Sequence, residues 1–209
     1  MPPLHQPGSR LLAALVLALA TGACAQSPPD AARAVAAATQ STPAAGCLAA
    51  GDGNLQARVR GALVADLDWG NAQMQCEGGM RPDGQGLRVA IAGPMPAGLG
   101  GTSGASAPAL LRFIFGIDLQ DVASGAAQAL PTNLTVIVEG GQQLYATRGD
   151  DKCAVENLQR TPIITSNGKL DRVHVRGYCT GPAADLDGNA RVLVPTFAFT
   201  AVVHNGDGP

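Results

Sequence analysis

Five cysteines are the residues of this chain whose type and spacing bear most directly on chemistry: Cys24, Cys47, Cys76, Cys153 and Cys179. Zinc sites built from cysteine usually contain pairs separated by two to four residues, and no two of these cysteines are that close. The C-x-x-C motif of redox enzymes is absent as well. The remaining chemistry is disulfide formation, which requires an oxidising compartment. We therefore expect no metal site and no cofactor.

Other residues with catalytic potential are few. His174 alternates with Arg172 and Arg176, a pattern that favours a solvated strand face over a metal site. No serine has the G-x-S-x-G context of a nucleophile. The run Asp185–Asn189 has its glycine at the fourth position, where a calcium loop needs it at the sixth, so it predicts a turn. We predict no catalytic residue; the alternative is an exported hydrolase whose site is assembled only in three dimensions.

The first 23 residues are typical of an export signal. Arg10 precedes an apolar run, Leu11–Ala20, and small residues follow up to Cys24. Ten residues at about 1.5 Å each cover only about half of a bilayer core of roughly 30 Å. We therefore expect residues 1–23 to be a cleaved signal peptide instead of a membrane-spanning helix.

The end of this segment resembles the signal of bacterial lipoproteins. Gly22 and Ala23 precede Cys24 as in that signal, whereas Thr21 departs from the aliphatic residue preferred there. The resemblance implies a diacylglycerol on the Cys24 sulfur and, since Ala25 is not Asp, anchoring in the outer membrane of the cell envelope. Ala23-Cys24-Ala25 also matches the A-x-A site of ordinary signal peptidase. A soluble periplasmic or secreted protein is therefore the alternative.

Lipid attachment to Cys24 and cleavage by ordinary signal peptidase both leave four cysteines able to form disulfides. Four cysteines allow three pairings. Asn167-Gly168 is typical of a two-residue hairpin turn, and a bulge or two would then place Cys153 opposite Cys179. We expect disulfides Cys153–Cys179 and Cys47–Cys76, each stabilising the fold by roughly 2 to 4 kcal/mol.

Composition divides the rest of the chain. Residues 24–45 are rich in Ala, Pro, Ser and Thr, with no apolar side chain larger than Val, and predict a flexible tether. Residues 46–209 have the length of a single domain. Without residues 1–23 the chain has 13 basic and 16 acidic side chains, which argues against a nucleic-acid partner. With one Trp, two Tyr and four Phe, a multi-ring sugar cleft is not expected.

The domain shows the alternation of half-buried strands. The segments with this pattern, separated by Gly, Pro, Asn and Asp turns, are Leu55–Trp69, Ala72–Gly78, Gly86–Gly93, Ala109–Leu119, Asn133–Glu139, Gln142–Arg148, Cys153–Thr165, Leu170–Cys179 and Arg191–Val203. We predict an all-β fold, an antiparallel β-sandwich of eight or nine strands, with a small β-barrel as the alternative. Pro162 should break its segment, and Pro195 should keep the start of the last one from full central pairing. On the last strand, Leu193, Phe197, Phe199, Ala201 and Val203 should share one face.

Six arginines fall on the polar side of these segments: Arg58, Arg60, Arg88, Arg112, Arg172 and Arg176. On neighbouring strands they would form a face able to hold carboxylates or phosphates of envelope glycans. Interleaved with Asp, they would instead simply keep an exposed sheet soluble. The loop Pro94–Pro108 is long enough to bind a partner. The domain resembles the small β-sandwich lipoproteins of bacteria, and we expect a non-catalytic binding or structural module with an envelope protein or glycan as its partner.

Overall fold

The structure, a computed structural model, describes residues 46–97, 99, 109–120, 129–141, 143–165 and 168–204. The expected signal peptide, residues 1–23, and the expected tether, residues 24–45, lie outside the described residues. Most of the loop Pro94–Pro108 lies outside them too.

The described residues form an all-β fold of eleven antiparallel strands, without an α-helix. The strands are β1 (Asn54–Gly61), β2 (Ala65–Gly70), β3 (Gln75–Met80), β4 (Gly86–Pro94), β5 (Leu110–Asp118), β6 (Leu130–Glu139), β7 (Gln143–Ala146), β8 (Cys153–Thr165), β9 (Gly168–Cys179), β10 (Ala183–Ala184) and β11 (Arg191–His204). A short 3-10 turn, η1 (Asn71–Gln73), separates β2 from β3. Eight of the nine predicted segments match one strand each to within three residues at either end.

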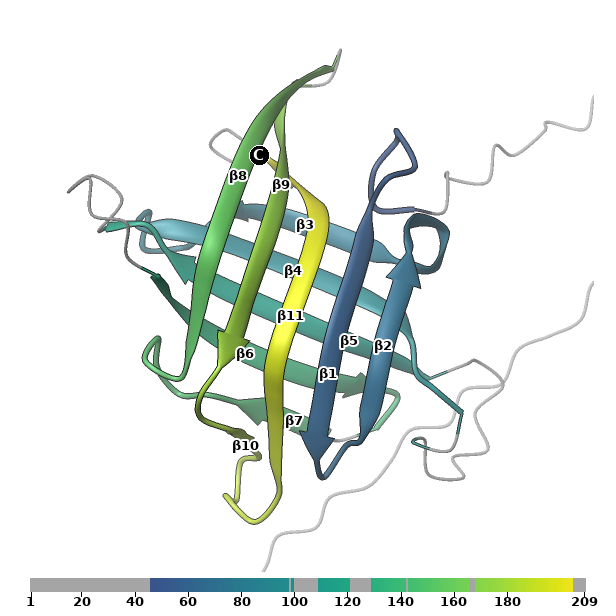
Figure 1. The fold of residues 1–209 in the computed structure, drawn as a ribbon, viewed down its shortest axis with the longest axis vertical. Coiled ribbons are helices and arrows are strands. Elements are labelled where there is room, and N and C mark those ends of the chain that lie inside the picture. Colours follow the sequence, from purple (N-terminus) through teal and green to yellow (C-terminus); the bar gives the residue numbers. More distant parts are fainter. Residues whose placement is uncertain are drawn as a thin grey trace, which may run out of the picture. The chain divides into compact units, whose positions relative to one another are not determined.

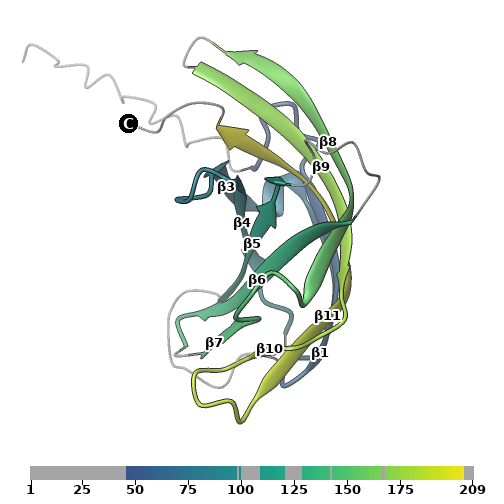
Figure 2. The same cartoon turned by 90° about the vertical axis from the view of Figure 1, so that its left-hand side faces the viewer.

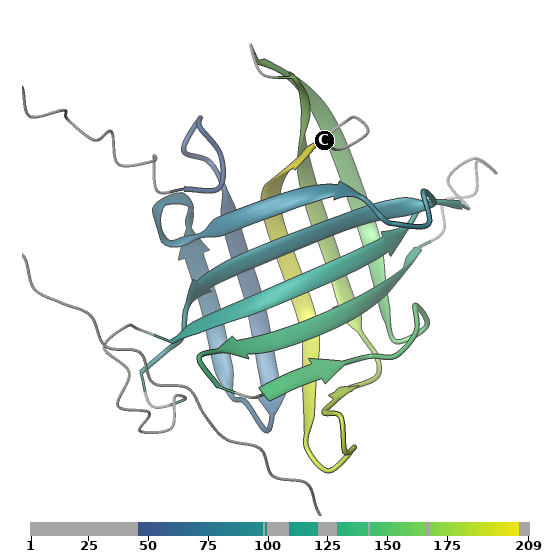
Figure 3. The same cartoon turned by 180° about the vertical axis from the view of Figure 1, so that it is seen from behind.

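The strands are arranged in two layers. The first layer has the order β2-β1-β11-β9-β8, and the second has the order β3-β4-β5-β6-β7. Figure 1 shows the first layer in front, with the strands of the second crossing behind it at a steep angle, and Figure 3 shows the second layer from its own side. The layers are joined where β6 pairs with β8 and where β10 bridges β7 and β11 (Figure 2). The predicted antiparallel β-sandwich is confirmed, with eleven strands among the described residues where eight or nine were expected.

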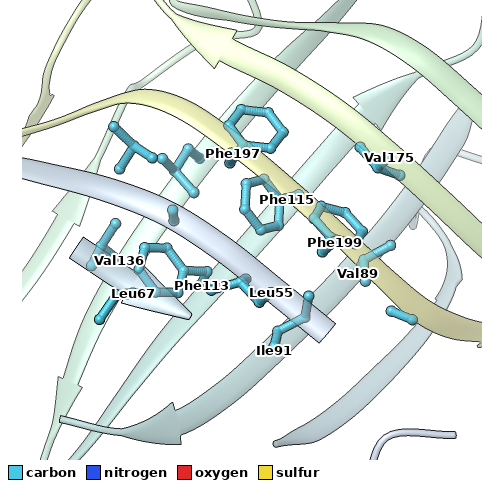
Figure 4. Close-up of a cluster of buried hydrophobic side chains, with 14 of the residues drawn as sticks. Leu55, Leu67, Val89, Ile91, Phe113, Phe115, Val136, Val175, Phe197 and Phe199 are labelled. Atoms are coloured by element: carbon cyan, nitrogen blue, oxygen red, sulfur yellow. The ribbon is translucent and has the colours of Figure 1, made fainter. Parts of the chain in front are cut away.

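The core lies between the two layers and is centred on a cluster of phenylalanine rings (Figure 4). Phe115 of β5 is fully buried, with its ring centroid 4.8 Å from that of Phe197 and 4.8 Å from that of Phe199, both on β11. Phe113 packs 6.3 Å from Phe115 and 5.9 Å from Trp69 of β2. The cluster joins β5 to both β11 and β2, so these rings hold the two layers together.

The segment Leu55–Trp69 is a hairpin, β1 and β2, where one alternating run was predicted. Val59 pairs with Ala65, so the turn keeps odd-numbered residues on the inner face of both strands. The period-two pattern therefore runs through the turn without interruption. Because alternation reports only which face a residue occupies, it could not reveal this turn.

Two prolines show how a strand accommodates a missing N–H. Pro195 falls in a bulge of β11, where β1 has one residue between Arg58 and Arg60 and β11 has two between its matching partners. The expectation for Pro195 is confirmed. Before the bulge, however, the even-numbered residues of β11 face the core: Val192 and Val194 are buried, whereas Leu193, predicted to face the core, is only partly buried. Pro162 does not break its strand. It pairs with Asp171 inside β8, a strand whose only ladder partner at that point is β9, and an edge position tolerates proline.

Both predicted disulfides are confirmed. Cys153 lies directly opposite Cys179 in the β8–β9 ladder, and a single bulge between Val155 and Asn157 provides the register. Thr165 pairs with Gly168, so Gly168 belongs to β9 and is not part of the turn, as the predicted Asn167-Gly168 required; residues 166–167 lie outside the described residues. The second disulfide joins Cys47 to Cys76 of β3 and fastens the segment before β1 to the edge of the second layer.

Candidate functional site

The outer face of the first layer carries an open hollow of about 680 Å³. It lies over β11, with β1 and β2 on one side and β9 and β8 on the other. Its floor is low because β11 presents two small outward residues there, Thr196 and Ala198. This volume is within the range of roughly 300–1,000 Å³ typical of small-ligand sites.

The register of the ladders fixes which side chains border the floor. On β1, Arg58 pairs with Thr196 and Gln56 pairs with Ala198. On β9, Arg176 pairs with Ala198, and Tyr178 follows on the same face two residues later. Two arginines, a glutamine and a tyrosine therefore surround the floor, and all four can donate hydrogen bonds.

Acidic side chains lie farther out, at the rim. Asp66 and Asp68 are on β2, one strand beyond β1, and Glu156 is on β8, in the bulge next to Arg176. Asp66 accepts a hydrogen bond at 2.7 Å from Arg60, and Asp68 accepts one at 3.5 Å from the Gln56 amide. Both β2 carboxylates are thus engaged with neighbours at the rim.

The six predicted outward arginines divide between two faces. Arg88 and Arg112 belong to the second layer, whereas the other four belong to β1 and β9 of the first. Four of the six form ion pairs, which are Arg60–Asp66, Arg88–Glu77, Arg112–Glu139 and Arg172–Asp52. Arg58 and Arg176 have no carboxylate within 4.0 Å in the described part of the chain, and both border the hollow.

His174 occupies the predicted outward face between Arg172 and Arg176, and it is partly buried. Its Nδ1 lies 3.1 Å from the hydroxyl oxygen of Thr200 on β11. This ring nitrogen is therefore engaged in a hydrogen bond within the sheet. Of the described residues, no histidine or serine lines the hollow, and its three carboxylates are exposed. These exposed carboxylates remain solvated, which does not favour an acid–base site in the hollow.

The run Asp185–Asn189 forms the predicted turn, between β10 and β11. The backbone N–H of Gly188 donates to the carbonyl of Asp185, and the Ala190 N–H donates to the Asp185 carboxylate at 3.1 Å. Tyr145 of β7 lies close enough to Asp185 for the charge of this carboxylate to act on the tyrosine hydroxyl. Burial, and then the charge of Asp185, raise the pKa of the Tyr145 hydroxyl. Neither Tyr145 nor Asp185 is among the residues that line the hollow.

The sequence identified the arginines of the hollow but missed Gln56, Tyr178, Thr196 and Glu156. Two bulges bring these residues together, one at Pro195 on β11 and one at Glu156 on β8. Alternation alone does not locate a bulge, and it does not give the strand order that makes β1 and β9 the two neighbours of β11. Pro195 pointed to the bulge on β11, and the spacing of Cys153 and Cys179 called for a bulge in the β8–β9 hairpin without giving its position.

No protein-family model matches this chain, and no curated protein or solved structure matches it either. The compartment therefore has to be inferred from the disulfides, which indicate an oxidising, extracytoplasmic location. Among the described residues no helix is long and apolar enough to cross a membrane. Cys24, the expected lipid-attachment residue, lies outside the described residues.

Proposed function

We propose that this chain is an exported protein of the cell envelope, anchored in the outer membrane by a lipid on Cys24, whose β-sandwich binds an envelope partner without catalysing a reaction. Residues 1–23 are removed on export, and residues 24–45 tether the sandwich to the membrane. A flexible tether of about 20 residues has a root-mean-square reach of roughly 25 Å. That reach leaves the outer face of the first layer accessible to large partners.

The anchor is supported by the use of the cysteines. Four of the five form disulfides within the sandwich, which leaves Cys24 for another purpose. It follows Gly22 and Ala23 directly, as the lipid-bearing cysteine of bacterial lipoproteins follows small residues. A diacylglycerol supplies two acyl chains, and two membrane signals are what stable anchoring requires.

The binding role is supported by one observation above all: the hollow on β11 is bordered by two guanidinium groups without an acidic partner among the described residues. Exposed arginines on a sheet normally lie beside acids that keep the face soluble, as four of the six do here. Catalysis is not supported, because the carboxylates that line the hollow are exposed.

Membrane fractionation tests the anchor. Cys24→Ala should release the full-length exported protein from the membrane fraction, because no sulfur remains for the lipid. The control is Thr21→Leu, which brings the signal closer to the lipoprotein pattern and should leave the protein in the membrane fraction. A Cys24→Ala protein that stays with the membrane contradicts the anchor.

Crosslinking in intact envelopes tests the binding role. The wild-type chain should capture a discrete partner, protein or glycan, that is absent when the chain is absent. Failure to capture any envelope component under conditions that crosslink a known envelope complex would count against a binding module.

A further inference from the structure

We propose that the hollow over Thr196 and Ala198 binds a carboxylate group of an acidic glycan, and that Arg58 and Arg176 hold this group. The inference rests on the proposed function and specifies the ligand class of the same surface. Its source is the geometry of the first layer, where β11 presents a low floor between two strands that both supply donors.

The dimensions of the hollow suit a sugar unit. Strands β1 and β9 flank β11, so their backbones lie about 10 Å apart, and the two floor residues lie about 7 Å apart along β11. Arg58 and Arg176 stand at opposite corners, with Cα atoms about 12 Å apart on these spacings. Arg58 and Arg176 line the hollow from these two corners, and the donors Gln56 and Tyr178 line it from the other two.

The pairing along the strands leaves neither guanidinium with an acidic partner among the residues that the structure describes. Arg58 is directly opposite Asp66 in the β1–β2 ladder, where opposite charges normally pair. Asp66 pairs instead with Arg60, at 2.7 Å. On the other side, Arg176 faces Asn157 and Ala198 across its two ladders, and neither is an acid.

The rim favours a singly charged group on a hydroxylated chain over a phosphate. Asp68 and Glu156 border the hollow beyond the donors, and they would repel a second negative charge. Carboxylates at the rim accept hydrogen bonds from sugar hydroxyls, while a planar sugar carboxylate matches the fork of an arginine. A uronate unit carries both groups. One tyrosine at the edge adds an apolar surface for the sugar ring.

Titration calorimetry of the full-length exported protein with trigalacturonate tests the proposal. We expect binding that weakens as salt rises, because the contacts are exposed ion pairs. Arg58→Gln and Arg176→Gln should each weaken binding by about tenfold or more, the range for losing a hydrogen bond to a charged group. Arg191→Gln is the matched control. It removes the same charge from β11 itself, five residues from Thr196 and thus about 17 Å along the strand, and should leave the affinity unchanged.

Two comparison ligands separate the sources of negative charge. The methyl ester of trigalacturonate keeps the size and hydroxyls and should not bind, and inorganic phosphate should bind far more weakly than the uronate. Equal binding of acid and ester, preference for phosphate, or identical losses in Arg58→Gln and Arg191→Gln would each overturn the proposal. If crosslinking captures a protein partner through this face while no uronate binds, the ligand class is wrong and the binding role stands.

Discussion

Replacing Phe115 by Ala tests whether the sandwich is held together by the ring cluster between its layers. Phe115 is fully buried on β5, and its ring lies 4.8 Å from Phe197 and 4.8 Å from Phe199 across the interface, by centroid. Truncation of a buried phenylalanine removes its transfer free energy and leaves a cavity, at a cost of about 3–5 kcal/mol. Since two aromatic contacts across the layers are lost as well, we expect a value in the upper half of that range.

The matched control is Ile114→Ala, one residue earlier on the same strand. Ile114 faces outward and is partly buried, so its truncation should lower the free energy of unfolding by no more than about 1.5 kcal/mol. Urea unfolding followed by tryptophan fluorescence measures both, because Trp69 is the single tryptophan and is 4% exposed beside Phe113.

A comparable loss in the two variants would refute the reasoning, because it would mean that both faces of β5 are buried alike. A double-mutant cycle of Phe115 and Phe199 gives a second check. The coupling should be about 0.5–1.5 kcal/mol for two rings in direct contact. A coupling of zero would show that β5 and β11 do not pack through these rings.

Two further predictions follow from the disulfides and from the buried tyrosine. Cys153 and Cys179 are 26 residues apart, so replacing both by Ala should lower the free energy of unfolding by about 3.5 kcal/mol through the added entropy of the unfolded chain; urea unfolding of the oxidised protein measures this, and an unchanged midpoint would contradict it. The pKa of Tyr145 is raised in the folded state by burial and by Asp185, so its contribution to stability is complete below the ordinary tyrosine pKa of 10.0 and is lost as pH rises through the folded pKa. Tyr145→Phe should flatten the decline of stability above that pH, and an identical decline in both proteins would rule this out.

The strands and the disulfides were predictable because their signals are local. The odd-numbered residues of β5 from Leu111 to Ile117 are all large and apolar, and all of them are fully buried. Cys153 and Cys179 were predictable because a hairpin converts sequence distance into register, and a one-residue bulge corrected the remaining offset.

The remaining features depend on contacts between distant segments. The short strand β10, Ala183–Ala184, was missed because two residues carry no periodic signal, and it exists only as a bridge between β7 and β11. Leu193 was placed on the wrong face because the bulge at Pro195 changes the parity of β11. The hollow depends on that same bulge and on the position of β11 between β1 and β9, which no segment reveals by itself.

The most direct test of the central claim, export with a lipid anchor on Cys24, is the mass of the N-terminal peptide of the protein extracted from cell envelopes. The account predicts a chain that begins at Cys24 and carries the added mass of a diacylglycerol on its sulfur. An unmodified chain that begins at Gln26, or one that keeps residues 1–23, would contradict it.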